Sequence, residues 1–300
     1  MYAIHQINKD TQDANTNTFD SSYQCGISLE SGKTPEDILK HVALGEGYFD
    51  ISYSLRDSET SMKKTIYGLT DEESKININA INGSNYKVLS NLVVLLGFDE
   101  NTALQIAASV VDWHDEDNAP TDEPNGAEDE NYMALAKPYH CKNMPFDSLE
   151  ELLLVKGMTP EIFSKIKNYL TIFPQDAPML SINLNTAPEI VIRALGRSVT
   201  GSMTNTEIAD ADSLAQKVVS YRRGGDNREA TGDDRIVDMN ELALNAREQI
   251  IFLSTQNQTA GISSYLRVKV RGTDSVSLMH SDIEAVVARD DLSIVYWHRH

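Results

Sequence analysis

The residues most suited to chemistry lie in one acidic segment of the chain. Nine carboxylates fall between residues 112 and 130, together with two prolines and one glycine. Carboxylates at this density repel one another, so a compact fold of the segment would be costly without a cation. Ca²⁺ binds six to eight oxygen ligands in loose geometry, whereas Mg²⁺ requires a tighter octahedron. The segment therefore predicts a structural calcium site, and a solvated acidic loop is the alternative.

The same segment does not fit the common catalytic or calcium-binding motifs. Asp115-x-Asp117 resembles the start of an EF-hand loop, but the glycine at loop position 6 and the glutamate at position 12 are absent. His114 beside these aspartates could bind zinc or two metals for hydrolysis. However, no second histidine lies at ligand spacing, and His140 stands alone. Phosphate-binding glycine loops, nucleophile elbows and C-x-x-C pairs are also absent. We therefore predict that the protein is not an enzyme.

Composition narrows the class of protein further. The chain has 300 residues, 41% of them hydrophobic, and 26 basic against 45 acidic side chains give a net charge of −19. This acidity opposes binding to nucleic acids and to anionic membrane surfaces. The strongest apolar run, Leu92–Leu96, is much shorter than the ~18 residues that a membrane span needs. An acidic, folded, soluble protein is expected.

The elements that would position the acidic segment change in type along the chain. The polar opening at 1–32 is expected to fray at its start. A helix is predicted from the cap Thr34 to Leu44. Alternating apolar residues predict strands at 48–55 and 64–69.

Helices follow from residue 76 onward, at 84–96, 99–113, 187–195 and 211–223. Two of these regions open alike, with Ile76-Asn-Ile-Asn-Ala80 and Ile182-Asn-Leu-Asn-Thr186, and each ends in an amphipathic helix. The pattern indicates a weak internal duplication. Chance similarity of helix caps is the alternative, because Asn and Thr are preferred at caps.

A helix-hairpin-helix pattern lies between the two regions. Ser148-Leu-Glu-Glu151 is a capping box, and a glycine turn at Gly157 precedes a second helix that starts at Thr159. In a basic protein this pattern would suggest contacts to the DNA backbone. Glutamates surround the turn here, so we interpret it as a packing motif without nucleic-acid binding.

Strands return near the C-terminus, at 266–271, 276–279, 283–288 and 292–297, with a turn at Asp290-Asp291. Strands at both ends and helices between them predict an α+β fold. Its β-containing domain, with an antiparallel sheet, comprises residues 1–75 and 245–300. An all-α insertion of helix-hairpin-helix or SAM-like type covers residues 76–244.

Cysteine usage leaves the redox compartment open. Cys25 and Cys141 are the two cysteines of the chain. They could form a long-range disulfide in an oxidising compartment or remain buried thiols in a reducing one.

Several motifs together carry a resemblance to a known family. They extend from about residue 65 to the C-terminus and occur in this order: Asp71-Glu72-x-x-Lys75-Ile76-Asn77-Ile78-Asn79, Asp112-Trp113-x-Asp115-x-Asp117, Gly126-Ala127-Glu128-Asp129-x-x-Tyr132, Pro145-Phe146-Asp147-Ser148-Leu149-Glu150-Glu151-Leu152 with Gly157, and Ile182-Asn183-Leu184-Asn185-Thr186-Ala187. This set resembles the K-class minor pseudopilins of the bacterial type II secretion system, the GspK family.

The resemblance implies a pilin-like αβ domain with a large helical insertion and a non-catalytic place at the tip of the pseudopilus. It implies exposure to the periplasm, calcium binding, and a complex with the I- and J-class minor pseudopilins that starts or caps assembly. By motif position, the candidate metal ligands are Asp112, Asp115, Asp117, Glu128 and Asp129. A periplasmic setting also favours a Cys25–Cys141 disulfide.

Two departures and two alternative functions accompany the resemblance. Mature family members begin with a long apolar helix that anchors them in the inner membrane, so we expect this chain to be the soluble part of a longer protein. The first 60 residues match the family weakly. A pilus-tip adhesin or assembly factor on the same scaffold is the alternative function, with a metal-dependent hydrolase as a weaker one. Sequence does not name the secreted substrates.

Overall fold

The computed structural model describes residues 1–13, 19–56, 63–200 and 204–300. The chain divides into two compact units. We name them the sheet unit (1–72, 220–237 and 261–300) and the helical unit (73–219 and 238–260). This division departs from the expected boundaries in three places, because 220–237 belongs to the sheet unit and both 73–75 and 245–260 belong to the helical unit.

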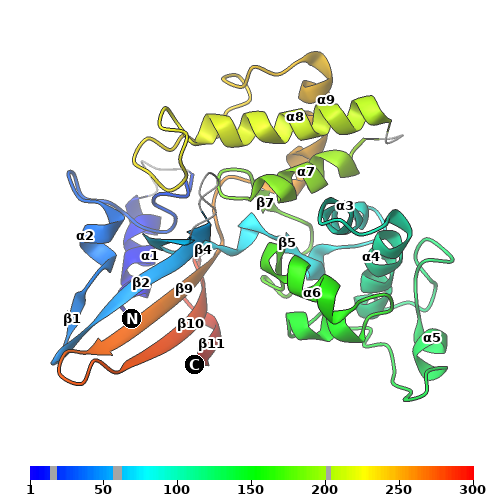
Figure 1. Cartoon of the computed structure of the whole chain (residues 1–300), viewed down its shortest axis with the longest axis horizontal. Coiled ribbons are helices and arrows are strands. Elements are labelled where there is room, and N and C mark those ends of the chain that lie inside the picture. Colours follow the sequence, from blue (N-terminus) through cyan, green and yellow to red (C-terminus); the bar gives the residue numbers. More distant parts are fainter. Residues whose placement is uncertain (14–18, 57–62, 201–203) are drawn as a thin grey trace. The chain divides into compact units, whose positions relative to one another are not determined.

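The sheet unit contains an antiparallel sheet of strands from both ends of the chain, as expected (Figure 1). Its main order is β1-β2-β9-β10-β11, while β3 pairs with β2 and β4 pairs with β9. The N- and C-terminal segments meet where Ile51 of β2 pairs with Val270 of β9. The strands are β1 (Val42–Leu44), β2 (Gly47–Arg56), β3 (Lys63–Tyr67), β4 (Thr70–Asp71), β9 (Tyr265–Asp274), β10 (His280–Ala288) and β11 (Ile294–Arg299). The α+β class with an antiparallel sheet is confirmed.

The opening of the chain is a helix, which corrects the expected frayed start. α1 (Tyr2–Asp13) buries Ala3 and Ile7, spaced one helical turn apart. These two side chains pack into the core of the sheet unit, which also contains Ile51 and Leu266. The apolar face of α1 is narrow, which is why the polar composition of this segment concealed it.

The next helix, α2 (Pro35–Leu39), has the predicted Thr34 cap and a capping box with Asp37. It ends before the predicted Leu44, because residues 42–44 form strand β1.

One buried carboxylate joins three distant parts of the sheet unit. Asp20 accepts hydrogen bonds from the backbone N–H of Gly26 (3.0 Å) and of Ser263 (2.8 Å). The guanidinium of Arg289 donates to both Asp20 oxygens, at 2.8 and 2.7 Å, and to Asp10 of α1 at 3.0 Å. Charge-assisted bonds of this kind are strong when water is excluded. The set ties α1, the segment at 20–26 and the C-terminal strands together.

In the helical unit, the two related openings have the same local structure. Ile76–Asn77 and Ile182–Asn183 each form a two-residue strand, and the strands pair in parallel with Leu170–Thr171 and Thr259–Ala260. In each opening the first asparagine side chain accepts a hydrogen bond from the backbone N–H two residues later, at 3.0 Å. The shared structure supports the predicted duplication.

Helices make up most of the helical unit, and the predicted ones are present. Their bounds are α3 (Lys87–Leu95), α4 (Glu100–His114), α5 (Asp129–Met133), η3 (Leu149–Leu154), α6 (Pro160–Ile166), α7 (Glu189–Ser198), α8 (Asn205–Arg222, whose last residues belong to the sheet unit) and α9 (Ala246–Thr255). The capping-box helix at 149–154 is a 3₁₀ helix, and α9 falls where no helix was predicted. Among the described residues, no helix is both long and apolar enough to span a membrane.

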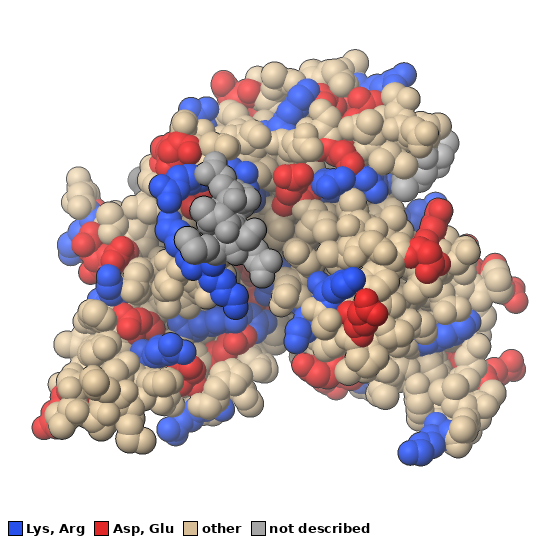
Figure 2. All heavy atoms as spheres, viewed as in Figure 1, with Lys and Arg blue, Asp and Glu red and all other residues tan. Residues whose placement is uncertain are grey.

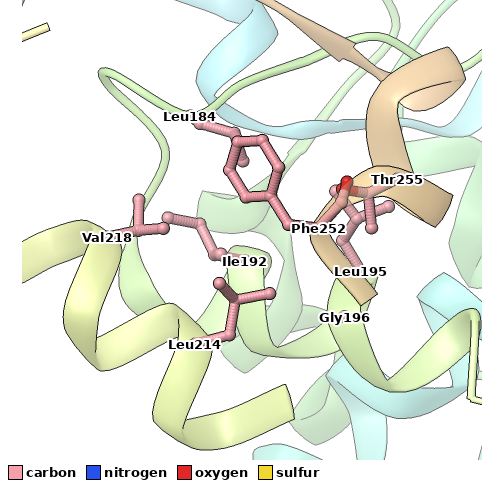
Figure 3. Close-up of a pocket in the computed structure, with 8 residues that line it drawn as sticks. All are labelled: Leu184, Ile192, Leu195, Gly196, Leu214, Val218, Phe252 and Thr255. Carbon is pink, nitrogen blue, oxygen red and sulfur yellow. The ribbon is translucent and has the colours of Figure 1, made fainter. Parts of the chain in front are cut away.

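The core between α7, α8 and α9 is apolar and nearly filled (Figure 3). Side chains from these helices and from Leu184 leave a cavity of about 10 Å³, which is room for roughly one water molecule. The lining is aliphatic and aromatic except for Thr255, so this space has no binding role that its chemistry would support.

We predict that Arg289→Met destabilises the sheet unit by about 3 kcal/mol, because it leaves the buried Asp20 carboxylate without its cation. Asp20 is 3% exposed, and among the described residues it would keep the two backbone donors Gly26 and Ser263 in this variant. Urea unfolding followed by circular dichroism measures the loss. Lys269→Met, which removes a half-exposed cation of β9, is the control and should cost much less. Equal losses in the two variants would contradict the role given to Asp20.

Candidate metal centre

The acidic segment is a loop that connects two helices of the helical unit (Figure 1). α4 ends at His114, and α5 begins at Asp129 with Glu128 as its N-cap residue. Asp99 caps α4 by accepting from the backbone N–H of Thr102. The apolar residues of α4 are buried, and they fix the direction in which the loop leaves the helix.

Asp112 holds this loop closed. Its side chain is fully buried, and its two oxygens accept hydrogen bonds from the backbone N–H of Thr121 (2.8 Å) and of Ala127 (2.5 Å). A side chain at Gly126 would clash with the same carboxylate and with the backbone of Thr121. Burial raises the pKa of Asp112, and the two N–H donors oppose that rise. Asp112 therefore organises the loop, a role that differs from the direct ligand expected from the motif.

Three of the five predicted ligands come together inside the closed loop. Asp115, Asp117 and Glu128 each offer an oxygen, and these atoms all lie within 4.8 Å of one another. Glu128 is only 4% exposed. Within the described residues, neither of its carboxylate oxygens has a hydrogen-bond partner, and Oδ1 of Asp115 is likewise buried without one. We name these three residues the carboxylate cluster.

Electrostatics in the carboxylate cluster are unfavourable without a cation. Burial, followed by the neighbouring carboxylates, raises the pKa of Glu128 to about 7 and that of Asp115 to about 6. Buried carboxylates are normally paired with a cation or bound to a metal. Unpartnered oxygens of Glu128 and Asp115, with Asp117 beside them, therefore fit a hard cation that prefers oxygen ligands.

Asp129 is placed differently from the other predicted ligands. Its Oδ2 lies 2.8 Å from Nδ1 of His140, and its Oδ1 accepts from the backbone N–H of Cys141 at 2.6 Å. The His140 interaction, followed by the Cys141 N–H, lowers the pKa of Asp129. This side chain is used to fasten the segment at 140–141, and the structure does not bring it into the carboxylate cluster.

Lys156 and an aromatic cluster support the loop, and the sequence analysis missed the lysine. Its ammonium group donates to the carbonyl oxygens of Gly126 (3.0 Å) and Asn125 (3.4 Å). The Trp113 ring packs edge-on against Tyr132 with centroids 5.3 Å apart, and Tyr139 stacks on Tyr132. The tryptophan and tyrosine of the family-like motifs thus form the apolar floor under the loop. No pattern in the sequence links Lys156 to the acidic segment, because it lies beside Gly157 in a turn outside residues 112–130.

His114, the residue on which the hydrolase alternative depended, lies outside the carboxylate cluster. Its ring packs edge-on against Phe146 with centroids 5.9 Å apart. Burial lowers its pKa. The cluster within the described residues therefore contains oxygen ligands alone, which suits a structural cation better than the nitrogen-rich set expected for zinc.

The two cysteines are free thiols, in contrast to the expected Cys25–Cys141 disulfide. Cys25 is buried in the sheet unit, with its sulfur 3.5 Å from Ser263 Oγ. Cys141 is buried in the helical unit and donates to the backbone carbonyl of Asp112 at 3.2 Å. Each sulfur is enclosed by its own unit, and the disulfide is corrected to two separate thiols.

We predict that the chelator-treated protein loses stability as the pH rises through the range from about 5 to 8. Glu128 and Asp115 have pKa values of about 7 and 6 in the fold, above the usual 4.5 and 3.8. The folded state therefore holds protons that the unfolded state has released, so deprotonation disfavours folding. Guanidinium unfolding in EDTA at three pH values measures this slope.

Glu128→Gln is the control for this prediction, because its neutral side chain removes one titrating group and should flatten the slope. Asp10 and Asp234 also have pKa values raised to about 6, and the lowered pKa of His114 contributes in the opposite direction, so the difference between the two proteins isolates Glu128. Stability that rises with pH in the wild-type protein, or an equal slope in the variant, would contradict the prediction.

Known proteins share the segment that contains this centre. Residues 74–175 match the family model for type II secretion system (T2SS) protein K. The type II secretion system protein K of Pectobacterium carotovorum subsp. carotovorum is 32% identical over 161 residues, which cover 50% of this chain and 47% of that protein. The protein K of Pseudomonas aeruginosa is 25% identical over 219 residues, which cover 68% of this chain and 63% of that protein. The matched part thus spans about half the length of the first relative.

A solved structure shares the fold over nearly the whole chain. It is a chain of the crystal structure of the GspK-GspI-GspJ complex from the enterotoxigenic Escherichia coli type 2 secretion system, with a TM-score of 0.64 and 16% identity. The match covers 99% of this chain and 91% of that chain. Residues 74–175, with the carboxylate cluster among them, are thus the part of the chain that matches the protein K family of the type II secretion system.

Proposed function

We propose that this chain is a minor pseudopilin of a type II secretion system, with a structural and non-catalytic role in protein secretion. The family match of residues 74–175 carries the proposal. The shared fold with a chain of the GspK-GspI-GspJ complex supports it. The partners proposed are the I- and J-class minor pseudopilins, and the place of action is the periplasmic side of the inner membrane.

The architecture supports a terminal place in a filament. In the sheet unit, α1 packs along the antiparallel sheet through Ala3 and Ile7, which is the arrangement of a pilin-like domain. The helical unit is an insertion in the sequence of that domain. A repeating subunit with so large an insertion would obstruct the subunit stacked above it. The proposed role is therefore to start or cap the assembly at its tip.

We also propose that the carboxylate cluster binds Ca²⁺ as a structural ion. Asp115, Asp117 and Glu128 supply three oxygen ligands that lie within 4.8 Å of one another. The loop is irregular, so it can add backbone carbonyls and water to reach the coordination number that Ca²⁺ prefers. Bound calcium would neutralise the buried Glu128 and keep the loop between α4 and α5 folded.

We predict that Glu128→Gln weakens Ca²⁺ binding by about tenfold or more, because it removes a buried charged ligand. Asp129→Asn is the matched control, since its carboxylate is hydrogen-bonded to His140 and Cys141. That variant should change the affinity less than about threefold. Isothermal titration calorimetry of each chelator-treated protein with CaCl₂ gives both values. If Asp129→Asn lowers the affinity as much as Glu128→Gln, the assignment of ligands is wrong.

We predict that the chain forms a stable complex with I- and J-class minor pseudopilins through its sheet unit. The purified proteins should elute together in size-exclusion chromatography. Ile250→Lys changes the exposed face of α9 in the helical unit, where Ile250 is 64% exposed, and should leave the complex intact. Separate elution of the wild-type proteins would contradict the proposed function. Loss of the complex in Ile250→Lys would place the partner surface on the helical unit instead.

A further inference from the structure

Apart from Met1 at the start of α1, the most exposed aliphatic residues described in the sheet unit lie at one turn. A strand was predicted at 276–279, but β9 ends at Asp274 and β10 begins at His280, so these residues form the turn between them. Their apolar side chains point into solvent: Val276 is 84% exposed, Leu278 70% and Met279 72%. The alternation that resembles a strand in the sequence therefore has no buried face here.

A fourth exposed aliphatic residue lies at the same end of the sheet. Leu44, the last residue of β1 before its turn into β2, is 66% exposed. Gly47 pairs with Asp274, so the β1–β2 and β9–β10 turns are neighbours (Figure 1). In the view of Figure 2, uncharged atoms cover most of this corner of the molecule. We name Leu44, Val276, Leu278 and Met279 the tip cluster.

The start of α1 lies close to the tip cluster. The ring of Tyr2 packs edge-on against Phe49 of β2, with centroids 5.6 Å apart. Phe49 pairs with Gly272, two residues before the β9–β10 turn begins at Asp274. One end of the sheet unit thus combines the beginning of its helix with two apolar hairpin turns.

The β9–β10 turn is held in a single shape. The Asp274 carboxylate accepts from the backbone N–H of Val276 (3.0 Å) and of Ser277 (2.6 Å) and from the Ser277 hydroxyl (2.8 Å). The Asp274 N–H donates to the carbonyl of Met279 at 3.0 Å. The turn therefore presents its side chains with little loss of entropy on binding.

Leu278 is unfavourable for the chain's own fold. Its φ is +57°, in the left-handed region that glycine and asparagine occupy far more readily than leucine. Its side chain is exposed, so no burial within the chain offsets this conformation. Strain combined with an exposed apolar side chain indicates a surface that is covered by another molecule.

Charge around the tip cluster indicates what covers it. The β1–β2 and β9–β10 turns carry the carboxylates of Glu46 and Asp274, and residues 42–49 and 272–281 contain no lysine or arginine. A second copy of this end would bring like charges together, and an anionic membrane would be repelled. We propose that the tip cluster docks into an apolar pocket of a partner protein whose rim carries lysine or arginine. This inference rests on the proposed function, in which the partner is the neighbouring minor pseudopilin.

The test compares variants of the full chain for binding to the I- and J-class proteins by surface plasmon resonance. Leu278→Asn relieves the strain, because asparagine tolerates the left-handed region. It should leave the melting temperature unchanged or raise it, and it should weaken binding at least tenfold. Val276→Asp and Glu46→Lys should also weaken binding at least tenfold. Ile294→Asp, at a 51% exposed residue of β11, introduces the same charge as Val276→Asp and should bind like the wild type.

The possible outcomes separate this inference from the proposed function. If the wild-type chain binds neither partner, the proposed function is contradicted and the docking surface with it. If the wild type binds and Leu278→Asn binds equally well, only the docking surface is wrong. Binding of the wild type to phosphatidylcholine or phosphatidylglycerol vesicles, lost in Leu278→Asn, would assign the tip cluster to a membrane and overturn the partner proposed here.

Discussion

The structure of the acidic loop depends on one buried carboxylate, Glu128, to which no described residue donates a hydrogen bond. Glu128 is 4% exposed, and its two oxygens lack partners among the described residues. Its neighbours Asp115 and Asp117 add charge of the same sign. Burying such a group without compensation costs several kcal/mol, far more than a surface carboxylate would. A bound cation removes this cost. Without a cation, the carboxylates of the cluster remove it by taking up a proton.

Contacts elsewhere in the loop hold the three residues of the carboxylate cluster together. Asp112 binds the backbone at Thr121 and Ala127, and Lys156 binds the carbonyls at the same bend, so the loop is closed from both sides. In these contacts the charged groups of Asp112 and Lys156 bind backbone atoms. They therefore do not neutralise the carboxylates of the cluster. The loop therefore combines a rigid frame with an uncompensated centre, as expected for a structural ion site.

Periodicity and caps in the sequence were sufficient to predict most elements, and local chemistry explains the exceptions. The strands at 48–55 and 283–288 and the helix at 99–113 carried strong apolar patterns, and each is present within a few residues. α9 was missed although its signal was visible, since Asn245 and Glu248 form a capping box. The turn at 276–279 could not be distinguished from a strand, because the hydrogen bonds of Asp274 decide its shape.

For the candidate site, too, the sequence predicts the segment but not the position of each side chain. Carboxylate density and the irregular loop drew attention to this segment, and the structure brings Asp115, Asp117 and Glu128 together there. Whether a given carboxylate faces the centre depends on which backbone N–H groups lie nearby, and spacing alone does not contain that information. Asp112 and Asp129 illustrate the difference, because backbone donors hold both side chains.

Thermal unfolding in EDTA, repeated after millimolar Ca²⁺, Mg²⁺ or Zn²⁺ is restored, tests the central claim most directly. A ligand at 100 times its dissociation constant adds ~2.7 kcal/mol to the free energy of unfolding. For a chain of 300 residues this corresponds to a rise of several degrees in the melting temperature. The account predicts that rise with Ca²⁺ and little or none with the other ions. A melting temperature that no ion changes, or that Zn²⁺ alone raises, would contradict a structural calcium site.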